Sequence, residues 1–529
     1  MPHERRSRRA GVLVPLFSMA STGSWGIGEI GDIGALAGWL ERAGLRLLQL
    51  LPINEVPHGE ASPYSALSAM AIDPQFITLG HVEDFAALGG EQRLDPELRR
   101  RLDAARAQTA VDYAEVRLLK QIALRQAFAR FRDVEWAGGT ARAAAFRAYV
   151  GDEAWWLEDY ALFRALHARF GERPWTEWPV PMRTRQPAAL AQAKDELRDD
   201  IMYRQYVQWI AGNQWADARA AAGGLALFGD LPFMVGADSA DLWARQDEFR
   251  FDASVGVPPD AFSATGQDWG LPVYRWDIIA GRGFDWLRDR GRRNAALFDG
   301  YRIDHLVGFY RTYFRPYDGS APAFTPDGEA AQIALGEQVL LAFRGCGAEI
   351  VAEDLGIVPD FVRESLARLG VPGYRVLRWE REWQREGQPF LDPAAYPVRA
   401  VATSGTHDTE PMAVWWEQAP REEREALLSI PFVGTGLGED DRSALLEAAV
   451  LPPSLREALL EALYASGADL LILPIQDLFG WRDRINRPAT IGPSNWRWRL
   501  PWPADRLATE PAAMAMAAQL REWGRRHGR

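Results

Sequence analysis

Cysteine is almost absent from this chain, which holds a single one, Cys346, among 529 residues. One cysteine cannot form an internal disulfide, so nothing in the sequence indicates an oxidising compartment, and we expect a cytoplasmic location. Histidine is also scarce, with seven residues, and no cluster of cysteine and histidine has the spacing of a zinc site. The sequence therefore predicts no bound metal and no cofactor.

Basic residues are outnumbered, because 60 Lys and Arg face 72 Asp and Glu and leave a net charge of -12. This balance argues against nucleic acid or an anionic membrane surface as the main partner. No apolar stretch approaches the roughly 20 residues that a membrane span needs. We expect neither a nucleic acid nor a membrane partner, and neutral small substrates remain compatible with the composition.

The first residues, "MPHERRSRRAGVLVPLFSMAS", combine a basic start, a short apolar run and small residues. A secretory signal peptide has this order, but here the apolar run is short and is interrupted by Pro15. We favour a basic tail followed by a first buried strand over 11–16.

Glycine-rich phosphate loops are also missing, since none follows an early strand, and this disfavours a Rossmann-type or other phosphate-binding enzyme. What the chain does have is an alternation of short apolar runs with stretches of helical periodicity, such as 32–44, 330–347 and 359–370. Continuous apolar strands that alternate with helices are typical of a parallel sheet. The eight runs expected to be strands are 11–17, 45–53, 224–233, 299–306, 348–356, 374–380, 398–408 and 468–479. Eight such repeats predict an α/β fold of the (β/α)8 TIM barrel type.

Two connections are too long for simple loops. Residues 80–220 are rich in Ala, Arg and Leu with amphipathic spacing, and we expect an inserted, mostly helical subdomain between strands two and three. Residues 234–297 are expected to form an inserted loop region over the active site, including a long ordered loop over 255–272. The whole chain, 1–529, is expected to be one catalytic barrel domain with these insertions.

Three acids follow expected strands of this barrel: Asp304 in "RIDH", Glu353 in "AEDLG" and Asp408 in "GTHD". Active sites of such barrels lie where the strands run into the following loops, so strands four, five and seven would direct three carboxylates to one place. Two carboxylates across a glycosidic bond are what glycoside chemistry requires, one ionised and one protonated.

Arg302 precedes Asp304 by two positions, so in a continuous strand over 300–306 both side chains share one face. A guanidinium there would keep Asp304 ionised, as a nucleophile must be. Glu353 has no cation so close in sequence, and a drier site near other carboxylates would raise its pKa, as a general acid needs. Each motif alone has a plain structural explanation, an ion pair, a turn or a helix cap. The three together favour catalysis.

These residues resemble the 4-α-glucanotransferases of the amylomaltase and disproportionating-enzyme type, glycoside hydrolase family 77 in the α-amylase clan. The resemblance runs from about Gly11 to Leu500. The segments that carry it include "GSWGIGEIGDI" (23–33), "SPYSALSAMAIDP" (62–74), "GDLPFMVGADSADLWA" (229–244), "GVPPDAFSATGQDWGLPVYRWD" (256–277), "YRIDHLVGF" (301–309), "AEDLGIV" (352–358), "SGTHDT" (404–409) and "NRPATIGPSNWRWRL" (486–500).

The resemblance implies that Asp304 is the nucleophile, Glu353 the acid/base and Asp408 a third carboxylate that favours the transition state. The residues that it implies in substrate binding are Arg302, His305, His407, Tyr64, Asp230, Gln267 and Trp269. It also implies α-1,4-glucans and maltooligosaccharides as donor and acceptor. The chain departs from the family pattern at Leu271 in place of Asn, Thr409 in place of Asn, and Tyr374 in place of Met, which leaves chain-length preference and acceptor choice open.

Two alternatives remain at this point. A hydrolase of the same clan would use the same three carboxylates but admit water, and sequence barely separates it from a transferase. A glucan-binding or regulatory protein with an inactive barrel is the other, and the intact Asp304, Glu353 and Asp408 speak against it.

Overall fold

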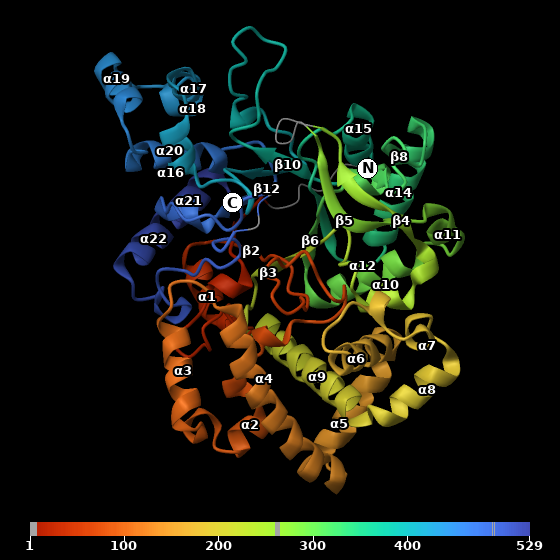
Figure 1. The fold of residues 1–529 in the computed structure, drawn as a ribbon. Helices are drawn as coiled ribbons and strands as arrows, with labels where there is room; N and C mark the ends of the chain where they lie inside the picture. Colours follow the sequence, from red (N-terminus) through yellow and green to blue (C-terminus); the bar gives the residue numbers. More distant parts are fainter. Residues whose placement is uncertain (1–7, 260–264, 489, 491) are drawn as a thin grey trace.

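A closed barrel of eight parallel strands forms the centre of the molecule (Figure 1). The computed structural model describes residues 8–259, 265–488, 490 and 492–529. In order around the barrel, the strands are β1 (Arg9–Leu13), β12 (Leu470–Pro474), β11 (Ala400–Thr403), β10 (Gly373–Val376), β9 (Glu349–Ala352), β6 (Gly300–Ile303), β3 (Ala226–Leu231) and β2 (Leu47–Gln49). Each of the eight expected apolar runs overlaps one of them, although β1 and β10 begin before their runs, so the predicted (β/α)8 barrel is confirmed.

The barrel closes through its first and last strands, because β1 pairs in parallel with β12 on one side and with β2 on the other. Val12 lies opposite Leu473, and both side chains are buried. Burial on both faces explains why these strands read as continuous apolar runs. The strand expected over 11–16 begins at Arg9 and ends at Leu13. The tail before it, Met1–Ser7, lies outside the described residues.

Helices cover the outside of the barrel, including the three expected ones. Their bounds are α1 (Asp32–Arg42), α14 (Glu329–Arg344) and α15 (Asp360–Leu369). Further helices lie along the chain after β3. They are α12 (Asp285–Leu297), α13 (Val307–Tyr310), α16 (Met412–Gln418), α17 (Arg421–Leu427), α18 (Pro431–Gly434), α19 (Glu439–Glu447), α20 (Pro453–Tyr464), α21 (Ile475–Phe479) and α22 (Pro511–His527). Among the described residues, no helix is long and apolar enough to cross a membrane.

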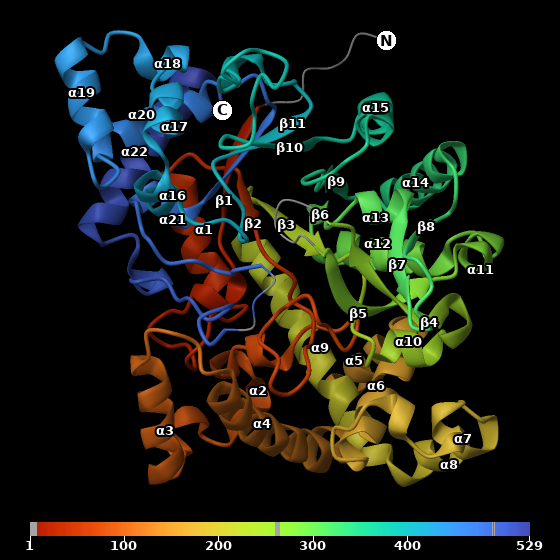
Figure 2. The same cartoon turned by 45° about the horizontal axis from the view of Figure 1, so that its top comes forward.

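The chain between β2 and β3 is mostly helical and extends below the barrel in Figures 1 and 2. Its helices are α2 (Glu83–Ala87), α3 (Pro96–Ala107), α4 (Tyr113–Arg130), α5 (Ala141–Asp152), α6 (Ala154–Arg169), α7 (Val180–Arg183), α8 (Pro187–Glu196) and α9 (Arg198–Ala221). Buried Gln208 on α9 accepts from the backbone N–H of Ile72 at 3.0 Å and donates to its carbonyl at 2.8 Å. This insertion is thereby fastened to the chain that leaves β2.

The second insertion differs from the expected loop. Strands β4 (Phe249–Val257) and β5 (Gln267–Tyr274) pair antiparallel, and this β4–β5 hairpin belongs to a sheet of order β5-β4-β7-β8. The partners β7 (Thr312–Pro316) and β8 (Ala323–Thr325) come from beyond the fourth barrel strand. Short helices, α10 (Ala240–Ala244) and α11 (Trp276–Gly281), flank the hairpin.

The expectation of a non-repetitive loop over 255–272 is therefore wrong for the residues that the structure describes, and 260–264 lie outside them. The error has a physical reason. Strand β4 is stabilised by β7, where Ser254 pairs with Arg315, and a contact of that sequence separation leaves no local pattern.

Candidate active site

The three predicted acids lie at the carboxyl ends of barrel strands. Asp304 directly follows β6, and Glu353 directly follows β9. The two strands are neighbours in register, with Ile303 opposite Ala352, so Asp304 and Glu353 leave the sheet side by side. The backbone N–H of Glu353 donates to the carbonyl of Ile303 at 3.0 Å, which continues the ladder for one more residue.

The sequence expectation of a strand over 300–306 needs a correction. Strand β6 ends at Ile303, residues 304–306 form a turn, and α13 begins at Val307. His305 has a φ of 43°, in the left-handed region that few side chains adopt. This turn directs the backbone N–H of His305 to the Glu353 carboxylate, to which it donates at 2.8 Å.

Arg302 joins two carboxylates beneath this turn. Its guanidinium lies 2.7 Å from Oδ1 of Asp304 and 2.9 Å from Oδ2 of Asp230. Asp230 on β3 is the register partner of Arg302 on β6, so the barrel itself sets this contact. Burial raises the pKa of Asp230 to about 6, although Arg302 opposes that change. The buried cation holds Asp304 as an ion pair, as the sequence suggested, and also neutralises a second acid.

Tyr64 reaches this cluster from the loop after β2. Its hydroxyl donates to Oδ2 of Asp230 at 2.7 Å, accepts from Arg302 at 3.0 Å and lies 3.1 Å from Nε2 of His407. The ring stacks on His407 with centroids 5.4 Å apart and lies 5.6 Å from Trp496. Tyr64 is thus a fixed wall of the site rather than a free side chain.

The pKa of Glu353 is strongly raised. Burial, followed by the nearby carboxylates of Asp304 and Asp354, raises its pKa to about 8, while Arg302 acts in the opposite direction. Its oxygens accept backbone hydrogen bonds from His305 and Leu355, the latter at 3.1 Å. At neutral pH the carboxyl is therefore largely protonated, which is the state a general acid needs.

Asp408 lies in the opposite electrostatic environment. Desolvation works against its charge, but His407 and the amide of Asn486 outweigh it and hold the pKa at about 2. His407 Nε2 lies 3.2 Å from Oδ2, and Asn486 donates to Oδ1 at 2.6 Å. Asp408 has 42% of its side chain exposed, compared with 26% for Asp304.

The β4–β5 hairpin supplies the remaining predicted residues. Trp269 meets His305 edge to face with ring centroids 4.8 Å apart, and its indole N–H donates to the side-chain oxygen of Gln267 at 3.3 Å. Both hairpin residues are partly buried. Burial lowers the pKa of His305 to about 4, so its ring is neutral at pH 7.

Of the ten predicted site residues, six form one network of direct contacts: Asp304, Arg302, Asp230, Tyr64, His407 and Asp408. Glu353 accepts from the backbone of His305, which follows Asp304 in the chain, and the hairpin pair is linked to His305 through Trp269. Sequence reasoning missed two residues of the site, Asn486, which contacts Asp408, and Trp496, whose ring lies 5.7 Å from that of His407. Both stand in the segment "NRPATIGPSNWRWRL", which carried the family resemblance without an assigned role. Among the described residues, no group of three or more His, Cys, Asp and Glu could hold a metal ion.

The chain is similar to known proteins in sequence and in fold. The model of glycoside hydrolase family 77, described as 4-alpha-glucanotransferase, matches residues 14–505. A 4-alpha-glucanotransferase of Thermus thermophilus is 35% identical over 495 residues, which covers 90% of this chain and 92% of that protein. A 4-alpha-glucanotransferase of a Synechocystis strain is 33% identical and covers 93% of this chain and 94% of its own. The amylomaltase of Streptococcus agalactiae, solved in complex with acarbose, is similar over 99% of both chains with a TM-score of 0.81 and 26% identity.

Proposed function

This chain belongs to the 4-alpha-glucanotransferase family, glycoside hydrolase family 77, and we propose on that basis that it moves α-1,4-glucan segments with retention through a covalent glycosyl-enzyme. One observation carries the mechanism. Asp304, paired with a buried guanidinium, and Glu353, with a pKa of about 8, follow adjacent strands. They supply the ionised nucleophile and the protonated acid that a retaining mechanism needs.

In the first half of the reaction, an oxygen of Asp304 attacks the anomeric carbon of the donor glucan. The bond to the leaving oxygen breaks, and Glu353 gives its proton to that oxygen, so the leaving chain departs with a free 4-hydroxyl. Arg302, 2.7 Å from the Asp304 carboxylate, orients it for the attack.

In the second half, Glu353 is a carboxylate and removes the proton from the 4-hydroxyl of an acceptor glucose or maltooligosaccharide. The acceptor oxygen attacks the anomeric carbon and releases Asp304. Two inversions restore the α-linkage, and Glu353 regains its proton.

The other residues are proposed to hold the reacting sugar. Asp408 has a pKa near 2 and stays ionised, so it can accept hydrogen bonds from sugar hydroxyls and stabilise positive charge at the anomeric carbon. The proposed binding residues around it are Arg302, His305, His407, Tyr64, Asp230, Gln267 and Trp269. Several contact one another, so their rotamers are fixed before the glucan binds.

Incubation with pure maltotriose, followed by separation of the products, tests transfer against hydrolysis. We expect glucose together with a ladder of longer maltooligosaccharides. Glucose and maltose alone would assign the protein to the hydrolases. The cytoplasmic location expected from the sequence stays a prediction, as does the absence of nucleic-acid and membrane partners.

A further inference from the structure

We propose that Asn486 is a positioning residue for the reaction, whose amide fixes the orientation of the Asp408 carboxylate. The inference rests on the role proposed for Asp408 in the glucan transfer. It concerns a side chain outside the ten residues that the sequence pointed to.

The two oxygens of Asp408 have different partners. Oδ2 lies 3.2 Å from His407, its neighbour in the chain, and Oδ1 accepts from Nδ2 of Asn486 at 2.6 Å. Asn486 is buried, with 9% exposed, whereas 42% of the Asp408 side chain is exposed. A short hydrogen bond from a buried donor therefore restrains a carboxylate that solvent alone would leave free to rotate.

The backbone around this contact is joined as well. The N–H of Asn486 donates to the carbonyl of His407 at 3.1 Å. Arg484 donates to the carbonyl of Asp408 at 2.7 Å and to that of Asn486 at 3.1 Å. Residues 484–486 and 407–408 thus form one unit, although 78 positions separate Asp408 from Asn486.

A carboxylate fastens this unit to the barrel. Glu410 pairs with Arg484 at 3.2 Å and with Arg378 at 2.6 Å. Arg378 is buried two residues after β10, the strand next to β11. The donor of the Asp408 hydrogen bond is therefore held in place from a neighbouring strand.

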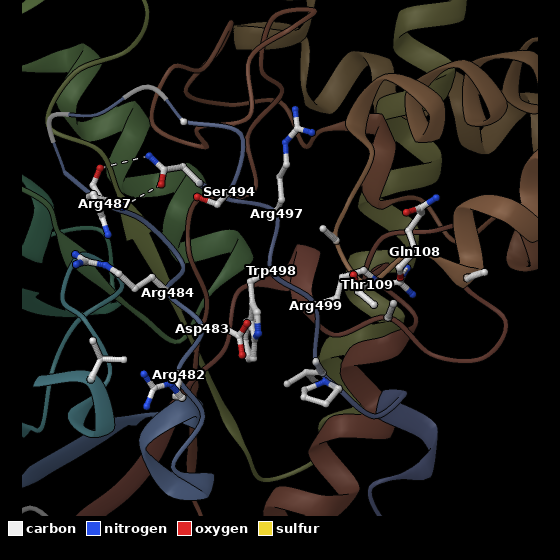
Figure 3. Close-up of a pocket in the computed structure, with 18 of the residues that line it drawn as sticks. Gln108, Thr109, Arg482, Asp483, Arg484, Arg487, Ser494, Arg497, Trp498 and Arg499 are labelled. Carbon is white, nitrogen blue, oxygen red and sulfur yellow. Dashed lines mark hydrogen bonds between the residues drawn. The ribbon is translucent and has the colours of Figure 1, made fainter. Parts of the chain in front are cut away.

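On the side away from Asp408, the segment that contains Asn486 borders a cavity. Arg482, Arg484 and Arg487 line a cavity of about 1060 Å³, with Gln108 and Thr109 on the opposite wall (Figure 3). Because the segment borders a cavity on that side, the hydrogen bonds described above help to set its distance from Asp408.

The test compares two buried asparagines of this segment. Asn486→Ala removes the donor to Asp408. Asn495→Ala is the matched control, because the side-chain hydrogen bonds of Asn495 within the described part of the chain go to Arg487 and Thr490 of its own segment. The assay is disproportionation of maltotriose, with kcat and KM measured separately beside a thermal melt.

We expect Asn486→Ala to lower kcat about 10–100-fold with KM changed less than about 3-fold, since a misplaced group affects mainly the transition state. Asn495→Ala should keep kcat within about 3-fold of the wild type. Equal losses in both variants would mean that only the order of the segment matters, and a raised KM with unchanged kcat would mean simple substrate binding. Either result overturns the inference.

Asn486→Asp tests the inference through the pH dependence of activity, which a purely structural role of Asn486 would not change. Two facing carboxylates raise the pKa of the pair, and the shared proton restores a hydrogen bond at low pH. The activity of this variant should therefore be poor at pH 7 and recover in part as the pH falls, so its pH optimum lies below that of the wild type. A profile that parallels the wild type contradicts the positioning role.

Asp408→Asn separates this inference from the proposed function. If Asp408→Asn stays active, the role of Asp408 itself is wrong. If Asp408→Asn is inactive while Asn486→Ala keeps its kcat, only the positioning role fails.

Discussion

Glu353 and Asp408 are carboxylates at the same end of one barrel, yet their surroundings move their pKa values apart, to about 8 and about 2. Glu353 is buried and accepts hydrogen bonds from backbone N–H groups, whereas the imidazole of His407 and the amide of Asn486 contact Asp408. This division assigns the proton donor and the permanent anion by environment rather than by residue type.

Activated donors separate the roles of the two adjacent acids. Asp304→Asn should abolish transfer from any donor, because no substrate supplies a missing nucleophile. Glu353→Gln should still be glycosylated by a glycosyl fluoride, since fluoride leaves without a proton. Mass spectrometry of the intact protein would detect the trapped glycosyl-enzyme. Equal loss in both variants on the fluoride would mean that the roles are wrongly assigned.

The same pKa has a consequence for stability. Glu353 stays protonated in the folded protein up to about pH 8, whereas it ionises near 4.5 in the unfolded chain. Its contribution is fully present below pH 4.5 and is lost as the pH rises through 8. Glu353→Gln, which cannot ionise, should therefore gain stability relative to the wild type as the pH rises, by on the order of 4 kcal/mol between pH 4.5 and pH 8.

Chemical unfolding of both proteins at pH 4.5 and pH 8 measures this difference. The exposed Glu364→Gln serves as the control, and it should show no comparable gain between the two pH values. A constant difference between Glu353→Gln and the wild type at both pH values would show that the Glu353 carboxyl ionises normally in the fold.

At the scale of elements, the β4–β5 hairpin brings Trp269 onto His305 of the β6 turn. A cover of this kind favours transfer, because the glycosyl-enzyme is protected from water until an acceptor binds. Trp269→Ala should raise the ratio of hydrolysis to transfer on maltotriose several-fold and weaken glucan binding. Glucose release and chain redistribution are measured together with a thermal melt.

Trp383→Ala is the matched control for this change, since Trp383 is 61% exposed and lies outside the hairpin. It should leave the ratio unaltered. A lower melting temperature for Trp269→Ala with an unchanged ratio would mean that the indole only packs the hairpin.

Helix α6 is joined to the loop after β3 by a buried imidazole. His167 lies 2.8 Å from Glu172 and 2.7 Å from Asp238, so both ring nitrogens face carboxylates. Burial disfavours the charged ring, but the two carboxylates outweigh it and raise the pKa of His167 above 6.5. The stabilisation is fully present below pH 6.5 and is lost as the pH rises through the raised value.

His167→Gln should therefore destabilise the protein most near pH 6, by about 1–3 kcal/mol, and progressively less at alkaline pH. Melting curves of this variant and of the wild type between pH 5.5 and 9 measure the trend. His81→Gln, at an exposed position, should show no such trend. A deficit that grows with pH would mean that His167 is neutral in the fold.

At the scale of the whole molecule, the barrel was predictable because each strand is a short apolar run that carries its own signal. Asp304 and Glu353 were predictable for the same reason, since each is the first residue after such a run. The hairpin was not, because β4 depends on β7, and Asn486 was not, because its partner lies 78 positions away. Contacts between segments far apart in the chain leave no local pattern in the sequence.

Closure of the barrel should also depend on a single small residue. Gly11 on β1 faces β2 so closely that an added methyl group would lie 2.5 Å from the carbonyl oxygen of Leu47. Gly11→Ala should destabilise the fold by about 1–3 kcal/mol or more and lower activity at a site it does not touch. Gly38→Ala in α1, which has open space around it, should be neutral or stabilising by up to about 1 kcal/mol. Similar melting temperatures for the two variants would contradict this.

The pairing of β1 with β12 also means that the barrel cannot close until nearly the whole chain has been synthesised. Arg9 and its partner Leu470 are separated by 461 positions. At about 5–20 residues per second, a ribosome needs roughly 20–90 s to make the intervening chain. During that time β1 has no partner on one side, while the helices between β2 and β3 already have their sequence complete. One edge of the apolar strand β1 is therefore unpaired during most of translation. A chaperone that protects this edge would have to act in that interval.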